Sequence, residues 1–110
     1  RRLRRHIELA RAFAAAVDAT PTWERLAPVP FSTVCFRHVP PGMAGDEARL
    51  ERHNAAVMDA VNRTGDVFLS HTKLNGRFAI RVSVGNIRTE ARHVEHAWEL
   101  LRRAAEEVEA

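Results

Sequence analysis

The segment that decides the fold is residues 73–84, which read Lys73-Leu-Asn-Gly-Arg-Phe-Ala-Ile-Arg-Val-Ser-Val84. Asn75-Gly76 predicts a tight hairpin, because a two-residue type I′ turn needs positive φ at both central positions and these residue types tolerate it. From Arg77 onward, apolar residues alternate with polar or small ones, which is the period of a strand with one buried face. We therefore predict a strand over Arg77–Val84 that returns from a first strand over Val67–Thr72.

The alternation sorts the side chains of the second strand between two faces. Arg81 stands at the strand centre on the polar face, where an arginine is costly unless it is paired or exposed. One interpretation is an arginine that pairs with a carboxylate of this domain or faces solvent. The other is a guanidinium fork that binds a ligand carboxylate in a cleft. The face predicted to pack on helices carries Phe78, Ile80, Val82 and Val84, and the other face carries Arg77, Ala79, Arg81 and Ser83.

Three helices are predicted where apolar residues recur at helical spacing. The first spans Leu3–Ala19 and ends at Thr20-Pro21, since the residue before a proline is pushed out of the α region. The second spans Asp46–Arg63, with Gly65 placed for a left-handed C-cap. The third follows Thr89, a good N-cap residue. Its apolar stripe comprises Val94, Ala97, Trp98, Leu101, Ala105 and Val108.

A strand and a link complete the predicted order. Phe31–Val39 is rich in β-branched and aromatic residues and is flanked by prolines, which predicts a strand. Trp23–Ala27 is expected to be a short, partly helical link. The order α-β-α-β-β-α predicts an α+β fold, in which a small, mostly antiparallel sheet carries helices on one face.

The bulk properties fit one small globular domain. The chain has 110 residues, 45% of them hydrophobic, with five glycines and five prolines, a composition typical of a packed core rather than of disorder. No apolar run approaches the roughly 20 residues that span a bilayer, and no secretory signal is present. Cys35 is the only cysteine, so no disulfide can form within the chain. We expect a cytoplasmic protein without a membrane partner.

The excess positive charge lies in the first turns of the chain. The net charge is +3, and five arginines near the start oppose one glutamate. A basic start can mark a nucleic-acid contact, but a solvated helix face explains it more simply. The β-α-β-β-α order also resembles RNA-recognition modules, which stack bases on aromatic side chains of an open sheet face. Phe78 belongs to the helix-packed face, so we expect no nucleic-acid partner.

No group of residues indicates catalysis by the chain itself. Cys35 lies in the middle of a strand, where a cysteine is normally a small, unreactive hydrophobe. His93 and His96 lie one helical turn apart, but no third metal ligand accompanies them. We therefore expect neither a catalytic group nor a metal in this chain. The other histidines considered, His6, His38 and His53, are scattered and form no pattern.

Four segments, in order along nearly the whole chain, resemble one enzyme family. The longest reads Phe68-Leu-Ser-His-Thr-Lys-Leu-Asn-Gly-Arg-Phe-Ala-Ile-Arg-Val-Ser-Val-Gly-Asn-Ile-Arg-Thr89 and continues as Thr89-Glu-Ala-Arg-His-Val-Glu-His-Ala-Trp-Glu-Leu-Leu101. The others are Ala27-Pro-Val-Pro-Phe-Ser-Thr-Val-Cys-Phe-Arg37 and His6-Ile-Glu-Leu-Ala-Arg-Ala-Phe13. Together they resemble the C-terminal (small) domain of the group II decarboxylases that depend on pyridoxal 5′-phosphate (PLP), the aromatic-L-amino-acid decarboxylase family.

The resemblance implies the small domain of a fold-type-I PLP enzyme, usually a tight homodimer with active sites between domains and subunits. Residues 1–27 would be a helix linking from a missing large domain, and residues 28–110 the C-terminal small domain. The full-length parent would use PLP to convert an amino acid to an amine plus CO2. This domain would contribute active-site closure and dimer support. Arg81, which matches the family's (Leu/Ile)-Arg pattern, would bind the substrate near its carboxylate.

The resemblance also limits what this chain does alone. PLP chemistry needs a lysine that holds the cofactor, a carboxylate beside the pyridinium nitrogen and a group that stacks on the ring, and in the family these lie in the large domain. Lys73 is the only lysine here, and it lies beside the Asn75-Gly76 turn, where a lysine is solvated rather than desolvated for such chemistry. We predict that the isolated segment binds no PLP and is not catalytic.

One alternative remains from the sequence, a standalone ferredoxin-like module with a regulatory or protein-binding role. The two interpretations differ in the surface they predict. A domain taken from a larger enzyme should expose, on its first helix and bare sheet face, the surface that the large domain normally covers. A standalone module should expose no such surface.

Overall fold

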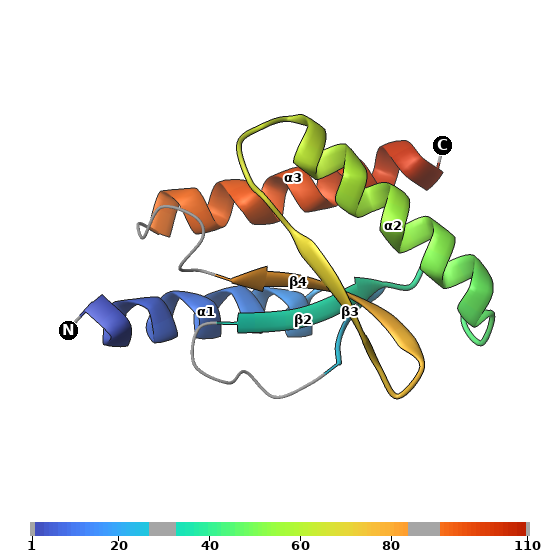
Figure 1. Cartoon of the computed structure of the whole chain (residues 1–110), viewed down its shortest axis with the longest axis horizontal. Helices are drawn as coiled ribbons and strands as arrows, with labels where there is room; N and C mark the ends of the chain where they lie inside the picture. Colours follow the sequence, from blue (N-terminus) through green and yellow to red (C-terminus); the bar gives the residue numbers. More distant parts are fainter. Residues whose placement is uncertain (1, 27–32, 84–90, 110) are drawn as a thin grey trace.

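We describe the fold from a computed structural model that places residues 2–26, 33–83 and 91–109. The chain forms three long helices and four strands (Figure 1). Their bounds are α1 Arg2–Ala19, β1 Trp23–Arg25, β2 Thr33–His38, α2 Glu47–Arg63, β3 Ser70–Leu74, β4 Arg77–Ser83 and α3 Ala91–Glu109.

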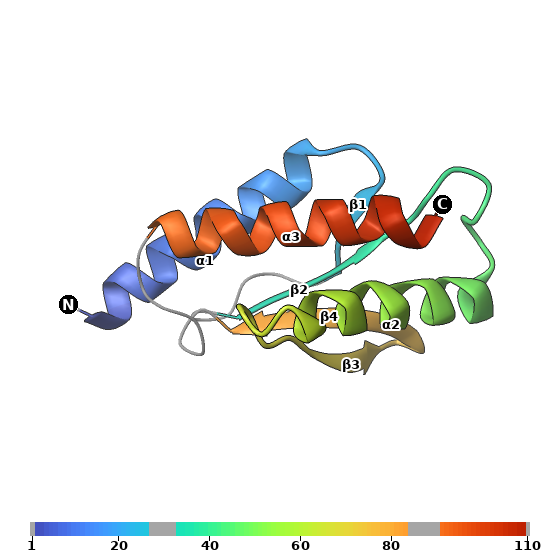
Figure 2. The same cartoon turned by 90° about the horizontal axis from the view of Figure 1, so that it is seen from above.

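The strands form one sheet in the order β1-β2-β4-β3, and every neighbouring pair is antiparallel. Helix α1 packs on β1 and β2, α2 packs on β2 and β4, and α3 rests on α1 and α2. Helices α1 and α3 run in the same direction and α2 runs against them (Figures 1 and 2). The predicted α+β class, with an antiparallel sheet and helices on one face, is confirmed.

The hairpin is the one that the sequence predicts. Asn75 and Gly76 have φ of 53° and 78°, the left-handed conformation at both turn positions. On β4, Phe78, Ile80 and Val82 are buried, whereas Arg81 is exposed on the opposite face. Val84, assigned to the buried face from the alternation, lies outside the described residues.

The predicted bounds of the first hairpin strand are wrong, because they begin and end too early in the chain. The sequence predicts Val67–Thr72, but β3 spans Ser70–Leu74. The two-residue turn fixes Leu74 opposite Arg77, so the strand must continue up to the turn. Before it, the side chain of Asn62 bonds the backbone of Leu69, accepting from its N–H at 2.7 Å and donating to its carbonyl at 3.0 Å. Asn62 thus satisfies the backbone N–H and carbonyl of Leu69, which lies outside the strand.

The predicted partly helical link is also wrong, because Trp23–Arg25 form the edge strand β1. Thr22 adopts a left-handed conformation with φ of 72°, which reverses the chain after α1. The Val39 N–H then donates to the Thr22 carbonyl at 2.6 Å, and Trp23 pairs opposite His38. The described order is therefore α-β-β-α-β-β-α, with one strand more than predicted.

The helices agree closely with the predicted bounds. Asp46 is the N-cap of α2 and accepts from the backbone N–H of Arg49 at 3.1 Å. Gly65 follows that helix with φ of 78°, as expected for a left-handed residue after a C-terminus. The proposed N-cap Thr89 and the start of the predicted strand at Phe31 lie outside the described residues. No helix in the described part of the chain is long and apolar enough to cross a bilayer.

Four aromatic rings join helices α1 and α3 to the sheet. The ring centroids of Phe13 on α1 and Phe36 on β2 lie 5.3 Å apart, and those of Trp23 on β1 and Trp98 on α3 lie 5.0 Å apart. Such tilted and edge contacts add to the apolar burial that drives packing. Residues 2–26 and 33–83 thus share one core. The predicted boundary between residues 27 and 28 falls outside the described residues.

The sheet face away from the helices is more polar than we expected for a surface that a large domain normally covers. Thr33, Cys35 and Ser83 are half-buried there, and Arg77 and Arg81 are exposed. Among the described residues, the only large hydrophobic side chain that is mostly exposed is Phe68, in the segment before β3. A partner that covers this open sheet face would therefore be held by polar contacts more than by apolar burial.

Candidate functional site

Arg81 lies at the centre of the open sheet face, in a row that crosses three strands. It pairs opposite Cys35 of β2 on one side and opposite Ser70 of β3 on the other. Its Nε donates to the Ser70 hydroxyl at 3.0 Å. No carboxylate among the described residues pairs with Arg81, which is exposed. A solvent-facing arginine and a fork that binds a ligand carboxylate both fit this position. The bond to Ser70 holds the Nε edge of the guanidinium.

Cys35, the neighbour of Arg81, is not poised as a nucleophile. It is half-buried on β2, and this burial raises the pKa of its thiol, an effect that the charge of Arg81 partly opposes. A thiol with a raised pKa is protonated at neutral pH, and only the thiolate attacks or binds metal. That Cys35 has no catalytic role stays a prediction.

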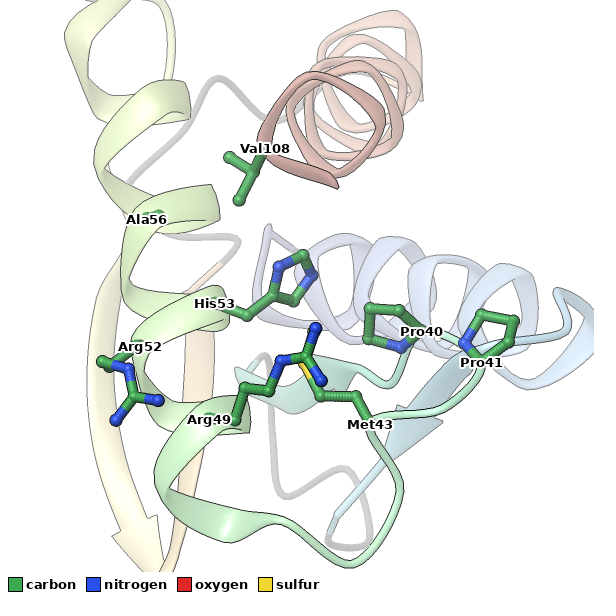
Figure 3. Close-up of a pocket in the computed structure, with 8 residues that line it drawn as sticks. All are labelled: Pro40, Pro41, Met43, Arg49, Arg52, His53, Ala56 and Val108. Atoms are coloured by element: carbon green, nitrogen blue, oxygen red, sulfur yellow. The ribbon is translucent and has the colours of Figure 1, made fainter. Parts of the chain in front are cut away.

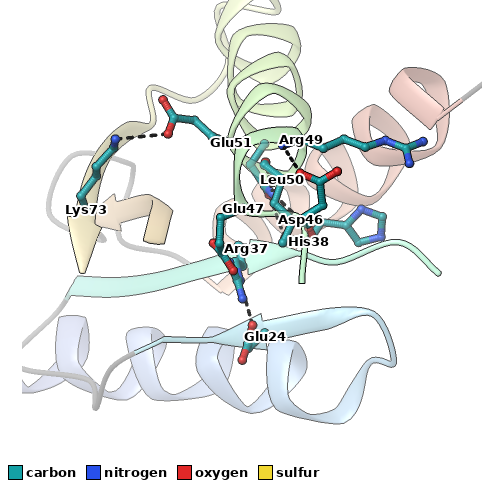
Figure 4. A network of polar contacts seen from close by, with 10 residues as sticks. Glu24, Arg37, His38, Asp46, Glu47, Arg49, Leu50, Glu51 and Lys73 are labelled. Carbon is teal, nitrogen blue, oxygen red and sulfur yellow. Dashed lines mark hydrogen bonds and ion pairs between the residues drawn. The ribbon is translucent and has the colours of Figure 1, made fainter. Parts of the chain in front are cut away.

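Arg37, near the end of β2, forms a buried ion-pair cluster that the sequence did not reveal. Its Nε donates to Glu24 of β1 and one terminal nitrogen donates to Glu47 of α2, both at 2.8 Å (Figure 4). Burial alone would lower the pKa of Arg37, but the bonds to the two carboxylates raise it above its ordinary value. The fork therefore stays charged and ties the edge strand to the start of α2.

We expect Arg37→Met to destabilise the domain by about 1–3 kcal/mol, because two charge-assisted bonds are lost while most of the apolar stem remains. The side chains of Glu24 and Glu47 are each 43% exposed, so their carboxylates can regain water, which limits the loss. Urea unfolding of the chain, followed by tryptophan fluorescence, measures the change. The control is Arg25→Met, whose pair with Asp18 is solvent-exposed and should contribute less than about 1 kcal/mol. Equal losses in the two variants would contradict a special role for the ion-pair cluster.

His38 and His53, which look unrelated in the sequence, meet in the interior. His38 Nδ1 and His53 Nε2 lie 2.9 Å apart, and His38 Nε2 lies 3.1 Å from the Thr22 hydroxyl. Burial, and secondarily the neighbouring His53, lower the pKa of His38 to about 4. Both positions could have been inferred from periodicity. His38 shares the core face of β2 with Val34 and Phe36, and His53 lies on the buried stripe of α2.

Asn54 secures this histidine pair from α2. Its side-chain oxygen accepts from the His38 N–H at 2.8 Å, and its nitrogen donates to the carbonyls of His38 and Leu50, each at 2.9 Å. Asn54 is fully buried. The end of β2 is therefore hydrogen-bonded to a helix side chain, at the position where the antiparallel ladder stops.

The remaining candidates carry no site. Lys73 is exposed and pairs with Glu51 of α2 at 3.2 Å, which is the solvated position predicted for it. His96 approaches Asp66 at 3.0 Å, and in residues 2–26, 33–83 and 91–109 no group of three or more potential ligands could hold a metal ion. A lysine in an apolar pocket, which PLP needs, does not occur in the described part of the chain.

Comparison with known proteins gives consistent relatives, although no protein-family model matches the chain. Tryptophan decarboxylase 2 of Oryza sativa subsp. japonica is 44% identical over 106 residues, which are 96% of this chain and 21% of that protein. Phenylacetaldehyde synthase of Arabidopsis thaliana is 38% identical over 103 residues, 94% of this chain and 21% of that protein. The crystal structure of Oryza sativa TDC with PLP and tryptamine matches with a TM-score of 0.88 at 31% identity, over 96% of this chain and 23% of that one. The chain thus spans about a fifth of the length of these curated relatives.

Proposed function

We propose that this chain closes the active site of a full-length aromatic-amino-acid decarboxylase, because it belongs to the group II PLP-dependent decarboxylases and corresponds to their C-terminal domain. The observation that supports this proposal is the match over almost the whole chain to a tryptophan decarboxylase, in both sequence and fold. In the proposed reaction the α-carboxylate leaves as CO2, and a proton takes its place on the α-carbon to give the amine. PLP, bound by the large domain, supplies the electron sink.

The residues of this chain do not fit the cofactor, which supports a division of labour between domains. Lys73, the only lysine in the chain, is exposed and ion-paired with Glu51. In the proposed arrangement residues 1–27 lead from the large domain, and residues 28–110 form the small domain. The parent is a cytoplasmic homodimer, with this domain supporting the dimer. The polar open face of the sheet suits a surface that meets another domain without being permanently buried.

Arg81 is the residue of this chain that we propose for substrate binding, near the substrate carboxylate. It lies on the open face, no carboxylate of the described residues neutralises it, and Ser70 fixes the orientation of its guanidinium. A planar fork held in this way can bind a carboxylate through two parallel hydrogen bonds. Arg81 would thus orient the acid group, while the chemistry takes place on the large domain.

In the full-length enzyme, Arg81→Gln should lower kcat/KM for the amino acid by about 10- to 100-fold, the usual effect of losing a charge-assisted bond. Arg77→Gln is the matched comparison, because Arg77 is exposed on the same face of the same strand, and its loss should be less than about threefold. Steady-state kinetics on both variants decides. If Arg77→Gln lost the activity and Arg81→Gln kept it, Arg81 would not be the substrate-binding residue.

PLP binding, followed by visible circular dichroism, tests the proposal that the large domain and not this chain holds the cofactor. Free PLP is achiral and gives no band, whereas PLP held in a protein site does. We expect the full-length parent to show the band and the 110-residue chain to show none at any PLP concentration. A band from the 110-residue chain that Lys73→Met abolishes would overturn the proposal that the cofactor site lies in the large domain.

A further inference from the structure

A pocket that the proposed function does not use lies on the helix side of the sheet, away from the open face that carries Arg81. It is a pocket of about 420 Å³ between the first half of α2, the end of α3 and the loop after β2. This volume is within the range of about 300–1,000 Å³ that is typical of small-ligand sites. Figure 3 shows its lining, in which Arg49 and His53 of α2 face apolar side chains of the loop and of α3.

Basic side chains are prominent in the lining of the pocket. Arg49, Arg52 and His53 line the pocket, and no acidic residue is among the described lining residues. The Arg49 side chain points over the cavity toward His53 and Met43, whereas the Arg52 side chain points away from it (Figure 3). Asp46 bonds the backbone N–H of Arg49, and Figure 4 shows the Arg49 guanidinium extending away from that carboxylate.

Two other arginines of the domain, unlike Arg49, have carboxylate partners. Arg25 pairs with Asp18, and Arg37 pairs with Glu24 and Glu47. The described residues offer Arg49 no ion pair. A second pocket contains Arg37 and Glu24, whose charges cancel, and a third, between α1 and α3, is mainly apolar. The pocket beneath Arg49 differs from these two because its described lining carries arginine without an acidic residue.

The opposite wall is apolar and held in place. Pro40, Met43 and Val108 face the arginine across the cavity. Two backbone bonds shape the loop, since the Met43 N–H donates to the Pro40 carbonyl at 3.1 Å and the Asp46 N–H donates to the Met43 carbonyl at 3.2 Å. At the inner end, the buried ring of His53 is fixed by its bond to His38. A ligand would therefore meet a largely preformed site, which lowers the entropy cost of binding.

From this arrangement we propose that the pocket under Arg49 binds a small organic carboxylate, with its acid group on the Arg49 guanidinium and its apolar body against Pro40, Met43 and Val108. A guanidinium fork matches a carboxylate, and the apolar wall favours an anion that carries a hydrocarbon body over an inorganic one. This site is separate from Arg81 and from the proposed decarboxylation, so the two proposals can fail independently.

The test uses the full-length protein with methyl-¹³C methionine and hexanoate as the probe. Within this chain the methionines are Met43, in the pocket wall, and Met58, outside it. Their signals are assigned with Met43→Leu and Met58→Leu. We expect hexanoate to shift the Met43 signal in a saturable manner and to leave the Met58 signal in place. Arg49→Gln should raise the half-saturating concentration about tenfold or more, the effect of losing a charge-assisted bond. Arg63→Gln, at the far end of α2, should not change it.

Two further probes test the chemical class of the ligand. Hexanol keeps the apolar body without the charge, and inorganic phosphate keeps the charge without the body. Each should need at least about tenfold more ligand than hexanoate to shift Met43. The proposal is overturned if hexanoate leaves Met43 unmoved, if Arg49→Gln binds hexanoate as well as the unmodified protein does, or if phosphate binds as well as hexanoate.

Discussion

Replacing Asn54 with leucine should destabilise the domain by about 3 kcal/mol or more, because it leaves buried backbone groups without partners. The leucine is similar in size but can replace none of the three bonds that Asn54 makes to His38 and Leu50. Asn54 has no exposed surface, so water cannot readily reach the N–H and carbonyl of His38 that it abandons. The end of β2 would then lose its connection to α2.

Urea unfolding of the chain measures this effect, since Trp23 and Trp98 are in ring contact within the core and their fluorescence reports its loss. Met58→Leu is the control, because Met58 lies half-buried on the same helix and a swap of similar volume should change the free energy of unfolding by about 1 kcal/mol or less. If Asn54→Leu also stayed within that range, the hydrogen bonds of Asn54 would not hold the fold.

The second large effect is a loss of stability in mild acid through His38. The pKa of His38 is about 4 in the folded chain, against roughly 6.5 for an unfolded histidine. Between these two pH values His38 is protonated in the unfolded chain but not in the folded chain, so the free energy of unfolding falls as the pH drops. The contribution is intact above about pH 6.5 and declines by about 1.4 kcal/mol per pH unit toward pH 4, to a total of about 3 kcal/mol.

The physical cause is that burial withdraws the His38 ring from water, which penalises its charged form, and that His53 lies beside it. Its two nitrogens face the Thr22 hydroxyl and the ring of His53, and the Trp23 ring lies 4.6 Å away. Unfolding free energies at pH 7.0 and 5.0 measure the effect. His38→Gln should be less stable than the unmodified chain at pH 7, but its free energy of unfolding should fall less between pH 7.0 and pH 5.0. His71→Gln, at an exposed position, should keep the full pH dependence. An unchanged pH dependence in His38→Gln would rule out His38 as its source.

Much of the fold follows from short-range patterns in the sequence. The Asn75-Gly76 turn fixes the register of its hairpin without reference to the rest of the chain. The alternation along β4 correctly assigns Phe78 and Arg81 to opposite faces. The same reasoning misses β1, since three residues are too few to show an alternation. The strand there depends on the left-handed Thr22 and on pairing with the distant β2.

The polar interior could not be predicted in the same way, because each contact joins residues far apart in the sequence. Arg37 meets Glu24 only because β1 pairs with β2, and the sequence gives no sign of β1. His38 and His53 could each be placed on a buried face, but their meeting depends on how α2 crosses the sheet. Arg81 was singled out because an arginine in mid-strand conflicts with its neighbours, a conflict visible in sequence alone.

The central claim is that this domain belongs to an enzyme that converts an aromatic amino acid to its amine and CO2. Product analysis on the full-length protein tests this claim most directly. The protein is supplied with PLP and with L-tryptophan or L-tyrosine labelled at the carboxyl carbon. We predict labelled CO2 and an equal amount of the corresponding amine. An oxo acid that keeps the label would contradict the claim, and so would CO2 released with an aldehyde in place of the amine.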